Sequence, residues 1–295
     1  MALTLEFSTT DSIELLDYLE YMSSEVDLRD TDQVLESGTM LKSLANNRNF
    51  LVDRVNQELL SWRNFQPGNS YSAQTLTLGG GKGFYVRANM WVPPSQVSGP
   101  QNWESNLYAY ARPHDHNFSF MTVGYFGSGY ATSIYEYDPE LIAGIPGEQV
   151  QLRFLEKTTL PVGKVMFYRA GRDVHSQEHP EEFSISLNLM LARPEVDWSN
   201  QYWFDLNKHT IQDFVQRPSV SGRLALCQLA RVLGNGATIN ILESIASHHE
   251  MPRVRASAYE SLAALTSCAA QTTWEYAVQD KHPFVRDLAR RALLY

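Results

Sequence analysis

The stretch Arg112-Pro113-His114-Asp115-His116 decides how this sequence is interpreted. It lies between two segments that read as β-strands, and residues two apart on a strand point to the same face. His114 and His116 can therefore reach one metal ion together, while Asp115 points away. A third ligand must come from a distant strand, and His175 is the candidate, because it follows a strand-like run and a glycine turn.

The composition and the hydrophobic spacing of the chain on either side of this stretch predict three regions. Residues 1–66 space leucine and isoleucine at helical intervals. Residues 67–196 contain many short runs rich in Tyr, Phe, Val and Thr, bounded by turn residues, which is typical of a β-sandwich or barrel. Residues 197–295 are rich in Ala and Leu and read as helical. We therefore expect an α+β protein with a central all-β domain.

The order of the motifs resembles the two-motif pattern of the cupin family over residues ~80–192. The His-x-His pair comes first, then a hairpin region, then Pro161-x-Gly163 and the following His175. The resemblance implies a double-stranded β-helix barrel with one metal ion. His179 is an alternative third ligand, ranked lower because the run before it reads as an exposed loop.

The predicted donor set is three imidazoles without a carboxylate. Many cupins carry a Glu shortly after the His-x-His pair, but this sequence has only Phe118, Ser119, Phe120 and Met121 there. Three nitrogen ligands with open positions suit Fe(II), and also Zn, Ni, Cu or Mn. An ion without an anionic ligand keeps its charge of +2, which favours an anionic or chelating substrate.

Three-His cupins include the cysteine dioxygenase-like family, which this sequence resembles beyond the ligands. That family carries Tyr-x-Arg before the metal motif, and its Arg binds the substrate carboxylate; Tyr85-Val86-Arg87 stands at a comparable place. An outward-facing surface Arg is the other interpretation of Arg87. The family's Ser-x-His-x-Tyr corresponds to the string from Ser186 to Met190, in which Asn188 replaces His and Met190 replaces Tyr.

Further residues are candidates for the pocket or for support of the ligands. Tyr108 and Tyr110 share the face of His114 if the strand is regular, and Asn188 completes the predicted lining. Core packing is the alternative for both tyrosines. Asp115 and Asp173 either orient an imidazole N–H or are ordinary surface carboxylates.

Three strings in the last region echo one another at intervals of about 31–34 residues, which is the range of helical repeats. They begin at Arg217-Pro218, Met251-Pro252 and His282-Pro283. The string HPFVRDLARRAL, which starts at His282, resembles the second helix of a HEAT repeat. Two or three such repeats hardly stand alone, so we expect them to pack on other parts of the chain.

Composition excludes some classes of function. The 295 residues are 43% hydrophobic, carry a net charge of -9 and contain no Lys/Arg-rich block, which argues against nucleic-acid binding. No secretory leader or membrane-spanning stretch is evident, and the two cysteines, Cys227 and Cys268, read as buried free thiols. We expect a cytoplasmic protein.

The leading hypothesis is a non-heme Fe(II) oxygenase that uses O₂ on a small, carboxylate-bearing, amino-acid-like substrate. One alternative is a metal-binding regulatory or interaction module without turnover. Another is a non-redox enzyme that uses Zn or Mn as a Lewis acid. The helical regions are the candidate surfaces for a homodimer or a protein partner.

Overall fold

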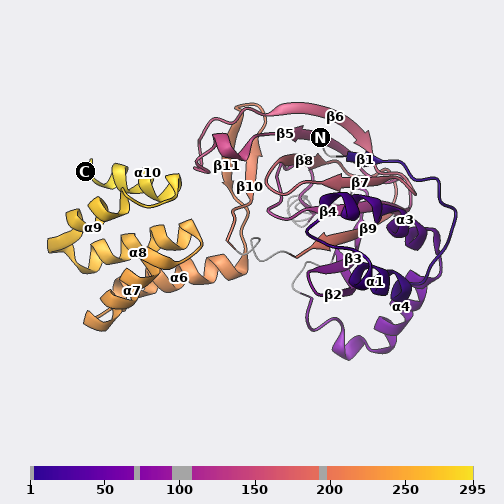
Figure 1. Ribbon diagram of the computed structural model, residues 1–295, viewed down its shortest axis with the longest axis horizontal. Helices are drawn as coiled ribbons and strands as arrows, with labels where there is room; N and C mark the ends of the chain where they lie inside the picture. Colours follow the sequence, from indigo (N-terminus) through magenta and orange to yellow (C-terminus); the bar gives the residue numbers. More distant parts are fainter. Residues whose placement is uncertain (1–2, 70–73, 95–107, 193–197, 295) are drawn as a thin grey trace. The chain divides into compact units, whose positions relative to one another are not determined.

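The computed structural model describes residues 3–69, 74–94, 108–192 and 198–294, and it divides into two compact units (Figure 1). The first unit contains Met1–Tyr137 and Gln151–Arg193, and the second contains Asp138–Val150 and Pro194–Tyr295. None of the helices in these described ranges has the length and apolar content that crossing a bilayer requires.

The first unit opens with one short strand, continues with helices and ends with strands. Its helices are α1 (Leu15–Ser24), α2 (Thr31–Glu36), α3 (Gly38–Asn46), α4 (Phe50–Leu60) and the 3-10 turn η1 (Trp62–Asn64). Its strands are β1 (Leu3–Leu5), β2 (Thr75–Gly81), β3 (Phe84–Trp91), β4 (Phe120–Phe126), β5 (Ala131–Glu136), β6 (Arg153–Thr159), β7 (Val165–Tyr168), β8 (Asp173–Gln177) and β9 (Ser184–Leu191).

The strands of the first unit form two antiparallel sheets. The larger has the order β1-β7-β4-β9-β3-β2, and the smaller has the order β6-β5-β8. The chain crosses between the sheets in both directions, because β4 is followed by β5 and β8 by β9. This crossing brings segments far apart in the sequence onto facing surfaces.

Alternating side chains give the larger sheet two different faces. On β9, Leu187 and Leu189 belong to an apolar cluster that includes Tyr18 of α1 and Leu41 of α3. The same face of β3 and β4 contributes Phe84, Val86, Ala88, Met121 and Val123. The helices labelled α1 and α3 in Figure 1 therefore cover this face, and their own apolar stripe is what they bury against it.

The opposite face of the larger sheet packs toward the smaller sheet. Trp91 of β3, Phe120 of β4 and Met190 of β9 share an apolar cluster with Ile134 of β5. Polar residues interrupt this inner layer, and Thr122, Ser186 and Asn188 are all buried there. The candidate site lies in this mixed layer between the sheets.

The structure confirms a mixed α and β protein whose sheets are antiparallel, with helices before the strands and after them. The sequence did not predict β1, which pairs with β7 at the edge of the larger sheet. Cys268 is exposed and Cys227 is buried, so the expectation of two buried thiols is wrong for Cys268. The domain limits at residues 66 and 196 stay predictions.

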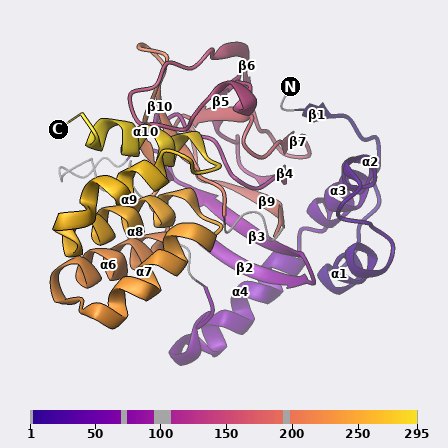
Figure 2. The ribbon, with the colours of Figure 1, turned by 60° about the vertical axis from the view of Figure 1, so that its left-hand side comes forward.

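The second unit combines a hairpin with helices (Figure 2). Its strands are β10 (Tyr202–Asp205) and β11 (Thr210–Phe214). Its helices are α6 (Pro218–Leu233), α7 (Gly236–His248), α8 (Pro252–Leu265), α9 (Ala270–Ala277), α10 (Pro283–Ala292) and the 3-10 turns η2 (Pro139–Leu141) and η4 (Ser267–Ala269). The sequence analysis did not predict the hairpin.

The three echoing strings occupy equivalent positions in this unit. Each proline begins a helix, at Pro218, Pro252 and Pro283. A proline fits in the first turn of a helix because a backbone N–H at that position would have no acceptor within the helix. The valine two residues later is buried in every case, and its exposed fraction is 2%, 2% and 1% for Val220, Val254 and Val285.

The last two strings also repeat a set of hydrogen bonds. Arg255 donates from Nη1 to the carbonyl oxygens of His249 and Glu250. Arg286, 31 residues later, donates from Nη1 to the carbonyl oxygens of Asp280 and Lys281. The periodicity in the sequence therefore corresponds to a repeated turn, and its assignment to the HEAT family stays a prediction.

Candidate metal centre

His114 and His175 are brought together by the backbone. The N–H of each residue donates to the carbonyl of the other, at 3.0 and 2.9 Å, in an isolated antiparallel bridge. Their rings lie 4.6 Å apart between centroids. The bridge replaces the regular strand that the sequence analysis expected around the His-x-His pair, but it still aims both imidazoles to the same side.

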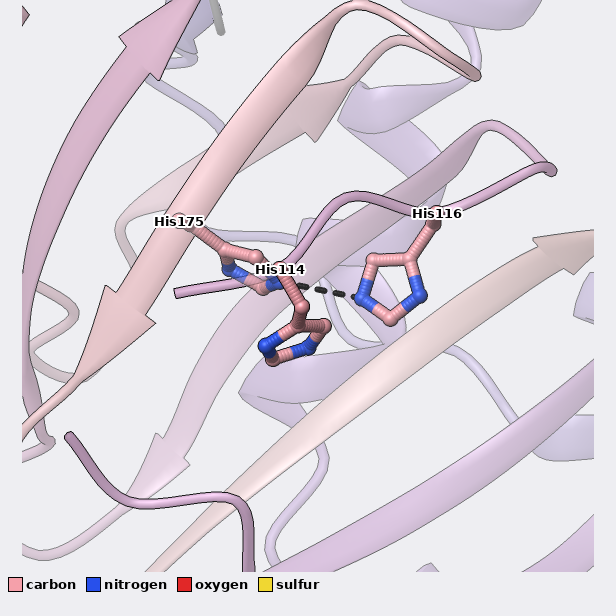
Figure 3. A group of neighbouring side chains, drawn as sticks. All are labelled: His114, His116 and His175. Atoms are coloured by element: carbon pink, nitrogen blue, oxygen red, sulfur yellow. Dashed lines mark hydrogen bonds between the residues drawn. The ribbon is translucent and has the colours of Figure 1, made fainter. Parts of the chain in front are cut away.

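His116 lies in the loop between this bridge and β4. Its carbonyl accepts a hydrogen bond from the N–H of Gly171, at 2.7 Å. Its ring stacks on Phe118 at 4.7 Å and meets Phe120 edge-on at 5.0 Å. These contacts turn the imidazole toward His175, as Figure 3 shows, and the two Nε2 atoms lie 2.9 Å apart.

The turn that leads to β7 is set by Pro161 and Gly163. Gly163 has a φ of +81°, a backbone conformation that residues other than glycine rarely adopt. Gly124 on β4 approaches this turn so closely that a Cβ atom there would lie 2.1 Å from the carbonyl oxygen of Pro161. The Pro-x-Gly motif therefore packs directly on the strand that follows the His-x-His pair.

All three imidazoles are held neutral. Burial lowers the pKa of His114 to about 4. Burial also holds the pKa values of His116 and His175 well below the usual range, and the neighbouring imidazoles add to the effect. Neutral imidazole is the form that binds metal ions, so protons do not compete for this site near neutral pH.

The side chains also fit a metal through their tautomers. Nδ1 of His114 lies 2.8 Å from the carbonyl oxygen of Arg112, so Nδ1 carries the hydrogen and Nε2 keeps its lone pair. One ligand atom from each of His114, His116 and His175 lies within 4.8 Å of the others. This set of side chains could hold one cation, and it is the set predicted from the sequence.

Arg87 lies on the inner face of β3, with Tyr85 and Trp91, whereas Phe84 and Val86 face the helices. Its positive charge contributes to the lowered pKa of His116, after burial and the other two imidazoles. Across the sheet it pairs with Asn188 of β9. The structure therefore places Arg87 inward and beside the triad.

Asn188 and the two predicted tyrosines have different surroundings. Asn188 is buried, and its Oδ1 accepts a hydrogen bond from Thr122, at 2.5 Å. Tyr110 is buried in the apolar layer and its hydroxyl bonds both the N–H and the carbonyl of Val92, at 3.1 Å. Tyr108 stacks on the ring of Tyr110, with the centroids 5.3 Å apart.

The backbone around the tyrosines differs from the expected strand. Ala109 and Ala111 have φ values of 53° and 52°, in the left-handed region. The period-two alternation of a regular strand therefore does not apply to this segment. It gives no reason to put Tyr108 and Tyr110 on the face of His114. The residue pattern alone carries no signal for two left-handed alanines on either side of one residue.

The remaining candidates occupy other positions. His179 packs its ring on Tyr110, 3.8 Å between centroids, and is not one of the clustered imidazoles. Asp173 is buried and binds Arg169. Asp115 is fully buried and accepts a hydrogen bond from the hydroxyl of Tyr137, at 2.7 Å. Neither aspartate is a surface residue.

Three further polar residues lie in the inner layer. The amide nitrogen Nε2 of Gln177 on β8 lies 3.1 Å from Nδ1 and 3.5 Å from Nε2 of His175. Tyr168 of β7 packs its ring 4.7 Å from that of His175, and burial raises the pKa of its hydroxyl well above the usual value. Thr132 of β5 lies directly opposite Gln177. For Gln177, the spacing of two residues from His175 on a strand was the available signal.

Comparison with known proteins gives only partial matches to solved structures. The sequence matches no protein-family model and no curated protein. Solved structures with partial similarity include a DMSP lyase structure, at 15% identity and a TM-score of 0.25 over 40% of this chain and 46% of that one. Salicylate 1,2-dioxygenase from Pseudaminobacter salicylatoxidans is 9% identical, with a TM-score of 0.27 over 48% of this chain and 33% of that one.

Vicilin from Corylus avellana, hazelnut, gives a comparable match, at 16% identity and a TM-score of 0.26 over 48% of this chain and 31% of that one. This chain thus spans less than half the length of each of these three structures. The matches therefore include two enzymes and vicilin, whose name states no reaction.

Proposed function

We propose that this chain is a cupin-type metalloenzyme that binds one Fe(II) ion on His114, His116 and His175, and that it oxygenates a small carboxylate-bearing substrate with O₂. The observation that carries the proposal is the convergence of three neutral imidazoles, drawn from two separate segments, in a buried polar layer. The absence of a carboxylate from this set leaves the charge of the cation uncompensated.

Iron would supply the electrons for oxygen activation, and the residues of the chain would supply binding and orientation. Arg87 would receive the carboxylate, because a guanidinium can hold both oxygens at once. Asn188, next to Arg87 across the sheet, presents a polar amide at the same depth. The ring of Phe118, which stacks on that of His116, would cover one face of this imidazole.

The proposal is tested first by metal content. Protein purified without added metal, then reconstituted anaerobically with Fe(II), is expected to hold one iron per chain by elemental analysis. His116→Ala is expected to lose the ion. His179→Ala is the matched control, because His179 lies near the same layer but outside the cluster, and it should keep the full metal content.

Oxygen consumption is the second test. The iron-loaded protein is expected to consume O₂ with at least one member of a panel of small amino, thiol and hydroxy acids, and His116→Ala should not. Stoichiometric zinc that iron cannot displace, with no oxygen uptake on the whole panel, would contradict the oxygenase and favour Lewis-acid chemistry.

A role in protein interaction is the second candidate, and one observation favours it. Helix α6 exposes four large apolar side chains to solvent, at Leu226, Leu229, Val232 and Leu233. Surface patches of this kind mark interaction sites. A metal-free His116→Ala protein that retains a cellular partner, with no turnover by the wild type, would support an interaction module without catalysis.

A further inference from the structure

Three polar side chains form one row across the inner face of the larger sheet. Arg87 of β3 lies directly opposite Asn188 of β9, and Asn188 lies directly opposite Thr122 of β4. Residues directly opposite each other on antiparallel strands point to the same face. Thr122 is fully buried and Asn188 is 2% exposed, so this row belongs to the polar part of the inner layer.

The row lies beside the candidate metal centre. The next row along the same strands contains Met190 of β9 and Phe120 of β4, and the ring of Phe120 meets that of His116 edge-on. Two residues along a strand correspond to about 7 Å. A small molecule with one end at the triad is therefore long enough to contact the row with its other end.

The amide of Asn188 has a defined orientation. Oγ1 of Thr122 lies 2.5 Å from its Oδ1, a separation that is typical of O–H···O and too short for N–H···O. The oxygen of the amide, and not its nitrogen, therefore faces Thr122. Oγ of Ser186 lies 3.4 Å from the same Oδ1. Ser186 accepts from the indole N–H of Trp91 at 3.0 Å, which leaves its own hydrogen for Asn188.

The NH₂ group of Asn188 is directed away from these hydroxyls. Within the described ranges, the side-chain hydrogen bonds of Asn188 use only Oδ1. An amide nitrogen donates hydrogen bonds and accepts none, and the same is true of the guanidinium of Arg87. The two neighbours therefore offer hydrogens, and no acceptor, to a molecule that lies over both of them.

Tyr130 supplies another neutral donor near the row. Its ring packs on Trp91, with 4.2 Å between the centroids. Burial raises the pKa of its hydroxyl above the usual value, and a hydrogen bond with Thr122 and the charge of Arg87 oppose this effect only in part. The hydroxyl of Tyr130 therefore keeps its hydrogen in the vicinity of both residues.

We propose that Arg87 and Asn188 form an acceptor-specific subsite for the free carboxylate of the substrate, and that Thr122 is a positioning residue that keeps the NH₂ group of Asn188 turned toward it. This inference rests on the proposed function, because the substrate is the one held at the metal. A carboxamide of the same shape is rejected, because in either orientation its NH₂ group meets Arg87 or Asn188 as donor against donor.

The test compares two ligands that differ in one group, β-hydroxypropionate and β-hydroxypropionamide. Calorimetry measures the binding of each to the full-length, Co(II)-loaded protein. The wild type is expected to bind the acid about 10–100-fold more tightly than the amide, because hydrogen bonds to charged groups are the stronger ones. Asn188→Asp presents an acceptor oxygen in place of the NH₂ group, so it is expected to bind the amide more tightly than the acid.

The role of Thr122 is tested separately. Thr122→Val removes the hydroxyl that orients the amide, so it is expected to weaken binding of the acid about 2–10-fold. Its affinity for Co(II) should not change. Thr122→Ser keeps the hydroxyl and is expected to bind the acid within about twofold of the wild type. Rescue by serine separates the effect of the hydrogen bond from that of the lost packing.

Thr75→Val is the matched control. Oγ1 of Thr75 on β2 donates to Oδ1 of Asn89 at 3.1 Å, and both residues are buried. The substitution thus removes the same kind of hydrogen bond from the same sheet, and it is expected to leave both ligand affinities unchanged. Urea unfolding of each metal-free variant shows whether the fold is intact before Co(II) is added.

Equal affinity of the wild type for the acid and the amide would overturn the subsite, and so would a Co(II)-loaded wild type that binds neither ligand. Equal losses of acid affinity in Thr122→Val and Thr122→Ser would overturn the positioning role. A wild type that binds no Co(II) is a separate outcome, and it rejects the proposed function itself.

Discussion

Nε2 of His116 and Nε2 of His175 lie 2.9 Å apart, although the residues are separated by 59 positions in the sequence. Two lone pairs at that distance repel unless a hydrogen or a cation lies between them. Burial disfavours a charged, protonated ring at this depth. The pair therefore makes the metal-free protein sensitive to acid and receptive to a divalent ion.

The first prediction concerns pH. Burial lowers the pKa of His114 from 6.5 to about 4, so below pH 6.5 the unfolded chain takes up a proton that the folded chain does not. The free energy of unfolding of the metal-free protein should be highest above pH 6.5. It should fall toward pH 4, by on the order of 3 kcal/mol from this residue alone. Urea unfolding at several pH values measures it, and His114→Gln should flatten the slope.

The second prediction concerns Arg87. Arg87→Gln removes the charge proposed to hold the substrate carboxylate, and charged hydrogen bonds contribute about 1.5–3 kcal/mol. The value of kcat/KM should fall roughly 10–100-fold, mainly through KM, while metal content stays at the wild-type value. Arg87→Lys should recover only part of the loss, because an ammonium cannot bind two oxygens in a fork. Unchanged kinetics in Arg87→Gln would show that the carboxylate binds elsewhere.

The third prediction compares two buried hydroxyls. Among the described residues the hydroxyl of Tyr168 has no hydrogen bond of normal geometry, although it lies near Thr132. Tyr168→Phe should therefore leave the stability of the metal-free protein unchanged or raise it by about 1 kcal/mol. Tyr110→Phe removes two bonds to Val92 and should lower it by about 1–3 kcal/mol. Thermal and urea unfolding of both variants give the comparison.

The fourth prediction concerns the second unit. Arg255 binds Asp280 through Nε and Nη2, at 2.8 and 2.7 Å, and the two side chains are 1% and 5% exposed. Asp280→Ala leaves the guanidinium buried without its counter-ion, which should cost about 3–5 kcal/mol. Lys281→Ala breaks only the exposed pair with Glu250 and should have no measurable effect. Equal effects of the two substitutions would contradict the assignment of the buried pair.

Metal content provides a control for that experiment. The triad lies wholly in the first unit, so Asp280→Ala should keep its full metal content under conditions where the first unit remains folded. Loss of the ion at temperatures that leave the first unit folded would show a coupling between the units.

Local patterns in the sequence predicted the features that depend on local rules. Each of these features can be recognised from the residues of a single element. They are the alternation on β3 and β9, the helical spacing before residue 66, and the prolines that begin α6, α8 and α10. The convergence of His114, His116 and His175 was also predicted, from the two-residue spacing of His114 and His116 and from the resemblance of the motif order to the cupin pattern.

Other features depend on tertiary contacts that leave little mark in the sequence. Ala109 and Ala111 adopt a positive φ, a conformation that alanine usually avoids, so their identity gave no warning of the irregular backbone. The side of β3 that carries Arg87 was undecided, because a polar inner layer reverses the usual rule that apolar residues face the core. The hairpin of β10 and β11 was not predicted, because the Ala- and Leu-rich sequence that follows it indicates helices for the whole region.

The alternation on β9 has a consequence for how this protein can change over generations. Leu187 and Leu189 support the helices, while Ser186, Asn188 and Met190 line the opposite layer. Substitution can alter either set alone, but gaining or losing a single residue within the strand exchanges the two sets. Lineages that retain this chemistry should therefore vary in the letters of β9 and keep its length constant.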